Sequence, residues 1–367
     1  MKTVALVDGR NQLSSTFWLT TREGDLTAQL SEPAEGGKVP VRRIKSTVLE
    51  GGPQKPKSWN FGADRAATSA TMLQVFEAYV TEIVRQAKEA RGPVDQLWFT
   101  IPAVKDSAVR LDYHRTLKHA AARGSGGAEV GFITEPDAVL QYFRLVDKRI
   151  EQSPGELEVY LVLDAGAGTT NISVVFKGKT LDGVGRLRED YTSRGALQPV
   201  FAEASNIAGD WIDERIPELF LQKARSVGIN RMDAGDALLR SLVEKDAERI
   251  KLALSTGRTS WVVKLPAGIG GKVREVAITR ADLASVVGEL TTRVEQLLED
   301  VLASAFKQLY GNSVYRPELE AQGVTSAEQF PRMLKYIILA GGSSQLPGFT
   351  GRLKSKLGLA ISQGAEL

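Results

Sequence analysis

The chain has 367 residues, more than one hydrophobic core usually supports, so we expect two domains. Its 47 Lys and Arg residues nearly balance 44 Asp and Glu residues, for a net charge of +3, and no basic stripe with interleaved aromatics occurs, so binding to nucleic acid or to a membrane surface is not expected. The absence of cysteine and the presence of only two histidines exclude disulfides and thiolate metal sites and disfavour a histidine metal site.

The first half of the chain alternates short apolar runs with helical stripes. A helix over residues 71–91 is predicted by its apolar stripe and is stopped by Gly92 and Pro93. The run at residues 3–7 predicts a buried strand that ends at Asp8. Further strands are expected at 39–44, 97–101 and 131–134, and further helices at 106–123 and 137–150.

The second half repeats this alternation after a Ser-Pro-Gly stretch at residues 153–155, where we place a domain boundary. The strand expected at 159–163 ends at Asp164, as the first strand ends at Asp8. Strands alternating with helices predict an α/β architecture with parallel sheets. The later elements are a helix at 237–254, a strand at 261–265, a long helix opened by a capping box at 279–282, and a strand at 336–339.

The stretch from Asp164 to Asn171 reads Asp-Ala-Gly-Ala-Gly-Thr-Thr-Asn. Its small residues would let backbone N–H groups approach a phosphate, and Thr169 and Thr170 would add hydroxyl donors. Asp164 would lie near phosphates with Mg²⁺ between them, held through water. The same residues also fit a tight hairpin turn, and the sequence leaves both interpretations open.

A second small-residue stretch, Gly341-Gly342-Ser343, follows the last expected strand. Adjacent glycines would let a flat ligand or a phosphate lie against the backbone. The alternative is an ordinary strand-to-helix turn with capping serines. Neither the P-loop spacing nor the Rossmann spacing occurs in the chain.

Together, and in this order, these stretches resemble the ATPases of the actin, sugar-kinase and seventy-kilodalton heat-shock chaperone superfamily, with the chaperones as the most similar branch. The likeness runs from about residue 97 to 354 and implies an α/β fold of two actin-like (ribonuclease-H-like) domains flanking a nucleotide cleft. Residues 1–153 would form the N-terminal lobe, with a reduced small subdomain. Residues 154–367 would form the C-terminal lobe, with a smaller subdomain at about 210–280. The segments that carry the likeness are 100–107, 133–138, 164–173, 248–255 and 338–347.

The resemblance also implies roles for individual residues. Glu135, Asp164 and Asp8 would be catalytic, with Asp164 and Asp8 holding Mg²⁺ through water, and Pro102 would relay the nucleotide state between domains. From the residues alone, Glu248 and Lys251 also fit a surface pair at helical spacing. The residues expected to bind ATP or ADP are Gly166, Gly168, Thr169 and Thr170 at the phosphates, and Glu248, Lys251, Ser255, Gly341, Gly342, Ser343 and Gln345 at the adenosine.

The sequence departs from this family at catalytic positions. Residues 10–12, Arg-Asn-Gln, stand where the family has small hydroxyl residues, and the subdomain that carries the catalytic lysine is largely lost between residues 62 and 71. Asn171 replaces an aspartate of the phosphate loop, and Gln345 replaces an arginine that stacks on adenine. These departures predict weak hydrolysis with nucleotide binding retained.

We therefore expect a cytoplasmic, ATP-binding, chaperone-like nucleotide switch that acts with a protein partner or client and hydrolyses ATP weakly or only with that partner. One alternative is an actin-like filament-forming ATPase whose nucleotide controls self-assembly, and another is a nucleotide-binding pseudo-ATPase scaffold. A sugar kinase is disfavoured because no sugar-positioning acids stand out. The family's closing helix and peptide-binding domain have no counterpart before Leu367, which fits either a truncated chain or a stand-alone ATPase-like unit.

Overall fold

The computed structural model divides the chain into two compact units, Met1–Glu135 and Pro136–Leu367. This division falls earlier than the boundary expected after Ser153, a residue outside the described ranges. The predicted strand at 3–7 with Asp8, and nearly all of the predicted helix at 137–150, also lie outside them. The structure describes residues 16–22, 25–30, 39–42, 44, 48, 56–59, 68–102, 107–135, 138–139, 158–178, 196–205, 207–229, 234–267, 269 and 273–357.

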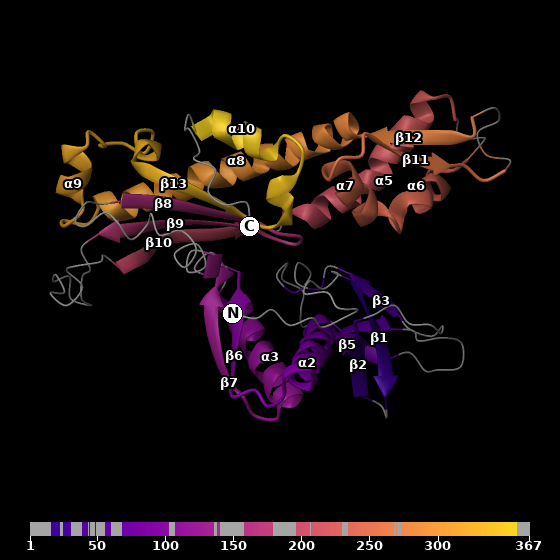
Figure 1. Ribbon diagram of the computed structural model, residues 1–367, viewed down its shortest axis with the longest axis horizontal. Helices are drawn as coiled ribbons and strands as arrows, with labels where there is room; N and C mark the ends of the chain where they lie inside the picture. The colour runs from indigo at the N-terminus through magenta and orange to yellow at the C-terminus, as the bar shows by residue number, and fades with distance from the viewer. Residues whose placement is uncertain are drawn as a thin grey trace. The chain divides into compact units, whose positions relative to one another are not determined.

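In its described ranges, the first unit contains three small sheets and two long helices (Figure 1). Its two long helices pack against each other around Phe76 and Tyr113, whose rings stack at a centroid distance of 4.9 Å. The helices and strands expected between residues 71 and 134 are confirmed within one or two residues at each end. The described elements are β1 (Thr16–Arg22), β2 (Asp25–Gln29), β3 (Val39–Arg42), β4 (Pro56–Trp59), β5 (Thr68–Thr71), α2 (Met72–Arg91), β6 (Gln96–Ile101), α3 (Ser107–Ser125) and β7 (Glu129–Thr134).

Local signals explain where α2 begins and ends. The Thr71 side chain accepts a hydrogen bond from the Gln74 backbone, and the Gln74 side chain accepts one from the Thr71 backbone. This reciprocal cap satisfies two amide groups that the first turn of a helix leaves unpaired. Gly92, at φ 86°, then ends the helix in a conformation that favours glycine.

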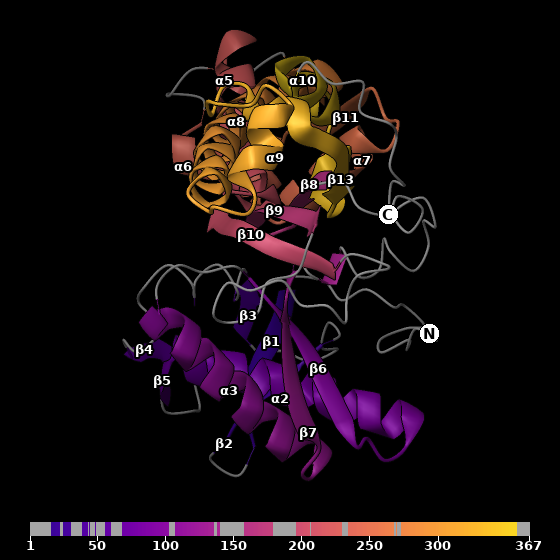
Figure 2. The ribbon, with the colours of Figure 1, turned by 90° about the vertical axis from the view of Figure 1, so that its left-hand side faces the viewer.

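The second unit is built on a four-stranded sheet in the order β10-β9-β8-β13, with α8 packed along it (Figures 1 and 2). The helices α5, α6 and α7 and the β11–β12 hairpin gather around the N-terminal half of α8 (Figure 1). The elements are β8 (Glu158–Ala165), β9 (Thr170–Gly178), β10 (Ala196–Ser205), α5 (Gly209–Ser226), α6 (Asp236–Glu244), α7 (Ala247–Ser255), β11 (Ser260–Lys264), β12 (Glu275–Thr279), α8 (Arg280–Tyr310), α9 (Arg316–Ala321), η3 (Phe330–Met333), β13 (Leu334–Ala340), η4 (Gly342–Gln345) and α10 (Phe349–Leu357).

The expectation of parallel sheets is only partly correct. β8 pairs in parallel with β13, and β6 pairs in parallel with β7, while the other described pairs are antiparallel. The parallel pairs are joined by long connections that contain helices, whereas a short turn such as that between β8 and β9 can only reverse the chain. The fold is therefore α/β with mixed sheets.

The helix expected over residues 237–254 is wrong as a single element, because it is two helices, α6 and α7. Their buried residues continue one helical stripe through Leu239, Val243, Ala247, Ile250 and Leu254, which is why the pattern predicted one helix. The break comes at the helix N-cap Asp246, whose carboxylate pairs with Arg249 at 2.8 Å. Aspartate favours the start of a helix over its interior.

The core of the second unit depends on β8 and α8. Six of the first seven residues of β8 are buried, as expected for a strand inside a sheet that is covered on both faces. The capping box predicted at 279–282 is confirmed, with Thr279 accepting from the Asp282 backbone at 3.2 Å. Across the described ranges of both units, no helix combines the length and apolar character needed to cross a membrane.

Candidate functional site

The carboxyl ends of β8 and β13 bring the two small-residue stretches together. The two strands run in parallel, and their register places Asp164 opposite Ala340. Asp164 also lies opposite Asn171 of β9. Because parallel strands end at the same edge of a sheet, the turn after Asp164 and the loop that begins at Gly341 are neighbours.

The turn after β8 is a tight hairpin, in which the Gly166 amide donates to the Thr169 carbonyl at 2.9 Å. Gly166 and Gly168 are half-buried and Ala167 is exposed, so the backbone of the turn is accessible at its tip. The geometry therefore realises the hairpin interpretation of the sequence. A hairpin turn with an exposed backbone of small residues remains suited to a phosphate.

The threonine side chains of this turn are used within the protein. Thr170 is fully buried and donates its hydroxyl to the Ile207 carbonyl at 2.7 Å. Thr169 is 2% exposed, and its hydroxyl accepts a hydrogen bond from the side-chain amide of Asn171 at 3.3 Å. The hydroxyl that we expected Thr170 to offer to a phosphate is therefore committed to Ile207 in this structure.

The two glycines after β13 differ sharply in their surroundings. Gly341 has φ 81°, and a Cβ atom there would lie 2.3 Å from the Ala165 carbonyl oxygen and 2.5 Å from Oδ1 of Asp164. Only glycine fits that position. A Cβ atom on Gly342 would meet no atom within 4 Å, and this residue is exposed. The loop thus leaves open space beside the residue that was expected to face adenosine.

Three segments meet at Gly209, the first residue of α5. The Gly209 amide donates to the Gly166 carbonyl at 3.2 Å, and Ser343 Oγ donates to the same carbonyl at 2.7 Å. Lys251 Nζ donates to the Gly209 carbonyl at 3.1 Å. A Cβ atom on Gly209 would lie 2.8 Å from Ser343 Oγ and 3.2 Å from Lys251 Nζ. The turn, the loop and α7 therefore surround one glycine that has no room for a side chain.

Lys251 pairs with a residue that the sequence analysis did not identify. Its side chain is 10% exposed, and its ammonium lies 2.7 Å from Oδ2 of Asp213 on α5. This buried ion pair replaces the surface pair with Glu248 that helical spacing allowed. Burial raises the pKa of Asp213 to about 6, with Asp210 and Glu248 adding to the rise and Lys251 opposing it.

Sequence reasoning missed Gly209, Asp210 and Asp213, because no local signal marks the start of α5. The run Ala208-Gly209-Asp210 opens a helix with no capping side chain, which is unusual for a helix start. In the structure, the Asp210 amide donates to the Ala167 carbonyl at 2.6 Å. Gly209 is required because the turn after β8 comes too close for a side chain. The first N–H groups of α5 donate to the carbonyls of that turn, which replaces a capping side chain.

The other expected site residues make none of the hydrogen bonds that the structure describes at Gly209. Ser255 donates its hydroxyl to the Lys251 carbonyl at 2.8 Å, and Glu248 is half-buried on the same helix. Gln345 is exposed at the end of η4. Glu135 belongs to the first unit, where Pro102 is buried just after β6, so the structure assembles only the candidates of the second unit.

Metal ligation was expected to involve Asp164 and Asp8, the second of which lies outside the described ranges. Among the residues that the structure describes, no group of three or more His, Asp or Glu side chains is placed to hold a metal ion. A cation held by one carboxylate, water and a phosphate needs no such group.

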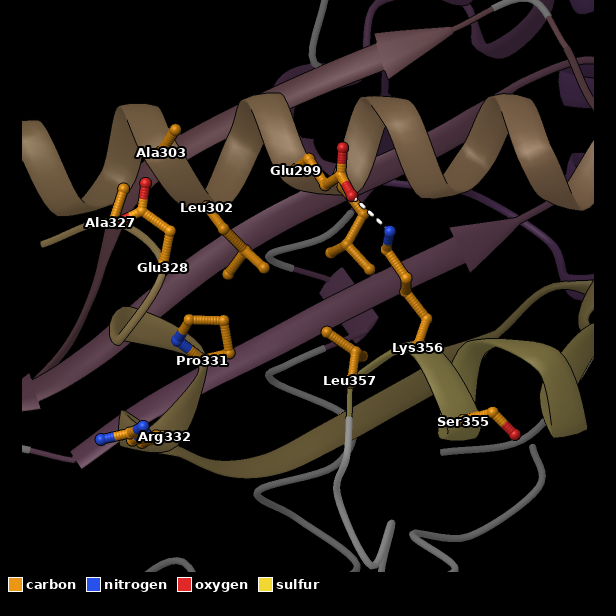
Figure 3. Close-up of a pocket in the computed structure, with 11 residues that line it drawn as sticks. Glu299, Leu302, Ala303, Ala327, Glu328, Pro331, Arg332, Ser355, Lys356 and Leu357 are labelled. Atoms are coloured by element: carbon orange, nitrogen blue, oxygen red, sulfur yellow. Dashed lines mark ion pairs between the residues drawn. The ribbon is translucent and has the colours of Figure 1, made fainter.

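A separate pocket of about 690 Å³ lies between α8, η3 and the end of α10 (Figure 3). Leu302, Pro331 and Leu357 contribute apolar surface to it, and Lys356 pairs with Glu299 at 2.6 Å along its wall. None of the expected site residues lines this pocket, and it takes no part in the arrangement around Gly209.

Comparison with known proteins places the chain at a distance from a chaperone. No protein-family model matches the chain. The chain is 25% identical over 353 residues to the chaperone protein DnaK of Cenarchaeum symbiosum (strain A), across 94% of this chain and 45% of DnaK. The chain therefore spans less than half the length of this curated relative. This similarity to a chaperone agrees with the resemblance drawn from the sequence motifs.

Proposed function

We propose that the chain is an ATP-binding, chaperone-like nucleotide switch. The observation that carries this proposal is the meeting of three segments at Gly209: the turn after Asp164, the loop of Ser343 and the helix of Lys251. These are the segments expected to hold phosphates and adenosine. A plain hairpin turn requires neither a buried lysine nor a serine from distant parts of the chain.

The residues present suit a nucleotide. The exposed tip of the turn offers backbone amides to phosphates. Gly342 leaves room for the base and ribose, since a side chain there would enter open space. Lys251, Ser343 and Glu248 supply polar groups on the adenosine side. When bound, Mg²⁺ would neutralise charge between Asp164 and the phosphates, with Asp8 contributing through water.

Hydrolysis is proposed to be weak or dependent on a partner. Phosphoryl transfer relies on positioned donors and electrostatic stabilisation around the γ-phosphate. Residues 10–12 are Arg-Asn-Gln in place of small hydroxyl residues, no counterpart of the family's catalytic lysine is evident, and Asn171 carries no charge. Glu135 and Asp164 would remain to position water and metal. A partner that supplies positive charge would then raise the rate.

The switch itself would consist of closure around the nucleotide, read by a protein partner or client. Expulsion of water on closure strengthens electrostatic contacts with phosphates. The distant similarity to a chaperone supports such a role over that of a small-molecule enzyme. The actin-like alternative predicts that nucleotide controls self-assembly.

Isothermal titration calorimetry of the purified chain with ATP, ADP and GTP tests the proposal. We expect ATP and ADP to bind with Mg²⁺ present, and GTP to bind much more weakly because the site is expected to recognise adenosine. No heat and no thermal shift with either adenine nucleotide would refute it. Light scattering with ATP separates the alternatives, since a nucleotide-dependent increase would favour the filament-forming ATPase over the switch.

A further inference from the structure

We infer that Asp213 is a positioning residue for Lys251 at the proposed nucleotide site, and that nucleotide affinity falls when Asp213 takes up a proton. This inference rests on the proposed function and deepens it. It concerns the adenosine side of the site, where Lys251 approaches Gly209 and Ser343.

Two acceptors fix the Lys251 ammonium. Nζ donates to Oδ2 of Asp213 at 2.7 Å and to the Gly209 carbonyl at 3.1 Å. The lysine residue as a whole is 8% exposed, so its charge has little access to bulk water. A buried ammonium needs a counter-charge, and a neutral carbonyl alone is a poor substitute. Asp213 is therefore the group that holds Lys251 beside Gly209.

The surroundings of Asp213 favour proton uptake close to neutral pH. Its Oδ1 atom is buried and has no hydrogen-bond partner among the described residues. Two acidic groups act on it, Asp210 on its own helix and Glu248 on α7, and Lys251 is the positive group that opposes them. Burial together with these two acids raises the pKa of Asp213 to about 6. The carboxylate is thus charged at pH 7.5 and largely protonated at pH 5.

Proton uptake by Asp213 would break its ion pair with Lys251. A neutral Asp213 no longer offers a counter-charge, so the Lys251 ammonium loses its strongest partner while still buried. The side chain then turns toward water or leaves Gly209. Since Lys251 is proposed to contact adenosine, ADP affinity should fall. A purely structural ion pair between α5 and α7 would affect stability without changing the pH profile of binding.

The test measures the dissociation constant of ADP, with excess MgCl₂, from pH 5.5 to 8 for the full chain and two variants. Asp213→Asn removes the titrating charge and keeps the side-chain shape. Asp236→Asn removes a carboxylate from another ion pair of the same unit, with Arg225, and serves as the matched control. ADP itself gains a proton in this range, which changes its affinity for every protein tested. The change in ADP affinity between pH 8 and pH 5.5, here called the pH step, is therefore compared between proteins.

With a pKa of about 6, only about a quarter of the Asp213 carboxylates stay charged at pH 5.5. We therefore expect the native chain and Asp236→Asn to lose roughly threefold more affinity between pH 8 and pH 5.5 than Asp213→Asn does. At pH 7.5, Asp213→Asn should bind ADP roughly tenfold more weakly than the native chain. If Asp213→Asn fails to fold, Lys251→Met replaces it, and the same reduced pH step is expected.

The outcomes separate the two proposals. Failure of the native chain to bind ADP at pH 7.5 would remove the proposed function and this inference together. Native binding with an unchanged affinity in Asp213→Asn at pH 7.5, or with the full pH step retained in Asp213→Asn or Lys251→Met, would overturn the inference alone.

Discussion

Ser343 Oγ donates a hydrogen bond of 2.7 Å to the carbonyl oxygen of Gly166, although 177 positions separate the two residues. The bond joins the loop after β13 to the turn after β8, and the parallel pairing of these strands makes it possible. It holds the expected phosphate and adenosine segments in a fixed relation before any ligand binds. Such preorganisation lowers the cost of ordering a site on binding.

Asp164→Asn should remove the Mg²⁺ dependence of ADP binding. The bridging cation is proposed to neutralise the Asp164 carboxylate against the phosphates, so the native chain should bind more tightly with Mg²⁺ than with EDTA. Calorimetry under both conditions measures this difference. At 100 times its dissociation constant, bound ADP should add about 2.7 kcal/mol to the free energy of unfolding. Asp300→Asn, at an exposed position of α8, is the control and should behave as native. A Mg²⁺ effect that survives Asp164→Asn would contradict this placement of the ion.

Gly342→Val and Gly341→Val should have opposite effects. A Cβ atom on Gly342 meets no atom within 4 Å, so its replacement should change stability by less than about 1 kcal/mol while abolishing ADP binding. A Cβ atom on Gly341 would collide with the Ala165 carbonyl oxygen at 2.3 Å. Its replacement should therefore cost more than about 2 kcal/mol of stability. Denaturant unfolding and calorimetry check both variants. Native ADP affinity in a folded Gly342→Val variant would show that adenosine lies elsewhere.

ATP hydrolysis should be slow in the isolated chain and slower still in Asp164→Ala and Glu135→Ala. The loss of one preorganised donor costs about 100- to 1,000-fold in rate, and the sequence lacks more than one. Single-turnover assays with excess protein measure the rate directly. Glu289→Ala, at an exposed position of α8, is the control and should keep the native rate. A rate indifferent to both site substitutions would mean that hydrolysis, if observed, comes from another source.

Stability should depend on pH through Asp213. Its pKa is raised in the folded state, from 3.8 to about 6, so its contribution to stability is fully present below pH 3.8 and is lost as pH rises through 6. The shift corresponds to a change on the order of 3 kcal/mol in the free energy of unfolding. Urea unfolding of native chain and Asp213→Asn between pH 4 and 7 measures it. As the pH rises from 4 to 7, the native chain should lose stability relative to Asp213→Asn. A constant difference in the free energy of unfolding between the two proteins would show that Asp213 titrates normally.

The sequence predicted those elements whose signals are local. α2 and α8 carry capping boxes, and β8 is an unbroken apolar run, so each follows from residues close together in the chain. α5 was missed because Pro217 lies inside it and no capping side chain opens it. β10 contains Pro199, where the register with β9 shifts. Both elements depend on tertiary contacts that no local pattern records.

The candidate site was predictable only in part, for a similar reason. The glycine and serine stretches could be recognised, and Gly341 and Ser343 do lie beside the turn after Asp164. The partner of Lys251 could not be predicted, because Asp213 lies 38 positions away on another helix. The buried role of Thr170 could not be predicted either, since it depends on the Ile207 carbonyl in a neighbouring segment.

α8 connects two groups of elements in the second unit. Its 31 residues form one continuous helix that packs on β9 and β10 along one half and on α5, α7 and β12 along the other. At 1.5 Å per residue it spans about 46 Å, so a tilt of about 5° at one end displaces the other by about 4 Å. Gly209 and Lys251 lie on α5 and α7, two helices that pack on the same half of α8 as β12, so their contacts would influence that tilt. Spin labels at Leu238 on α6 and Ser355 on α10, both exposed, would register a change in distance when ADP binds, and an unchanged distance would show that the helix transmits nothing.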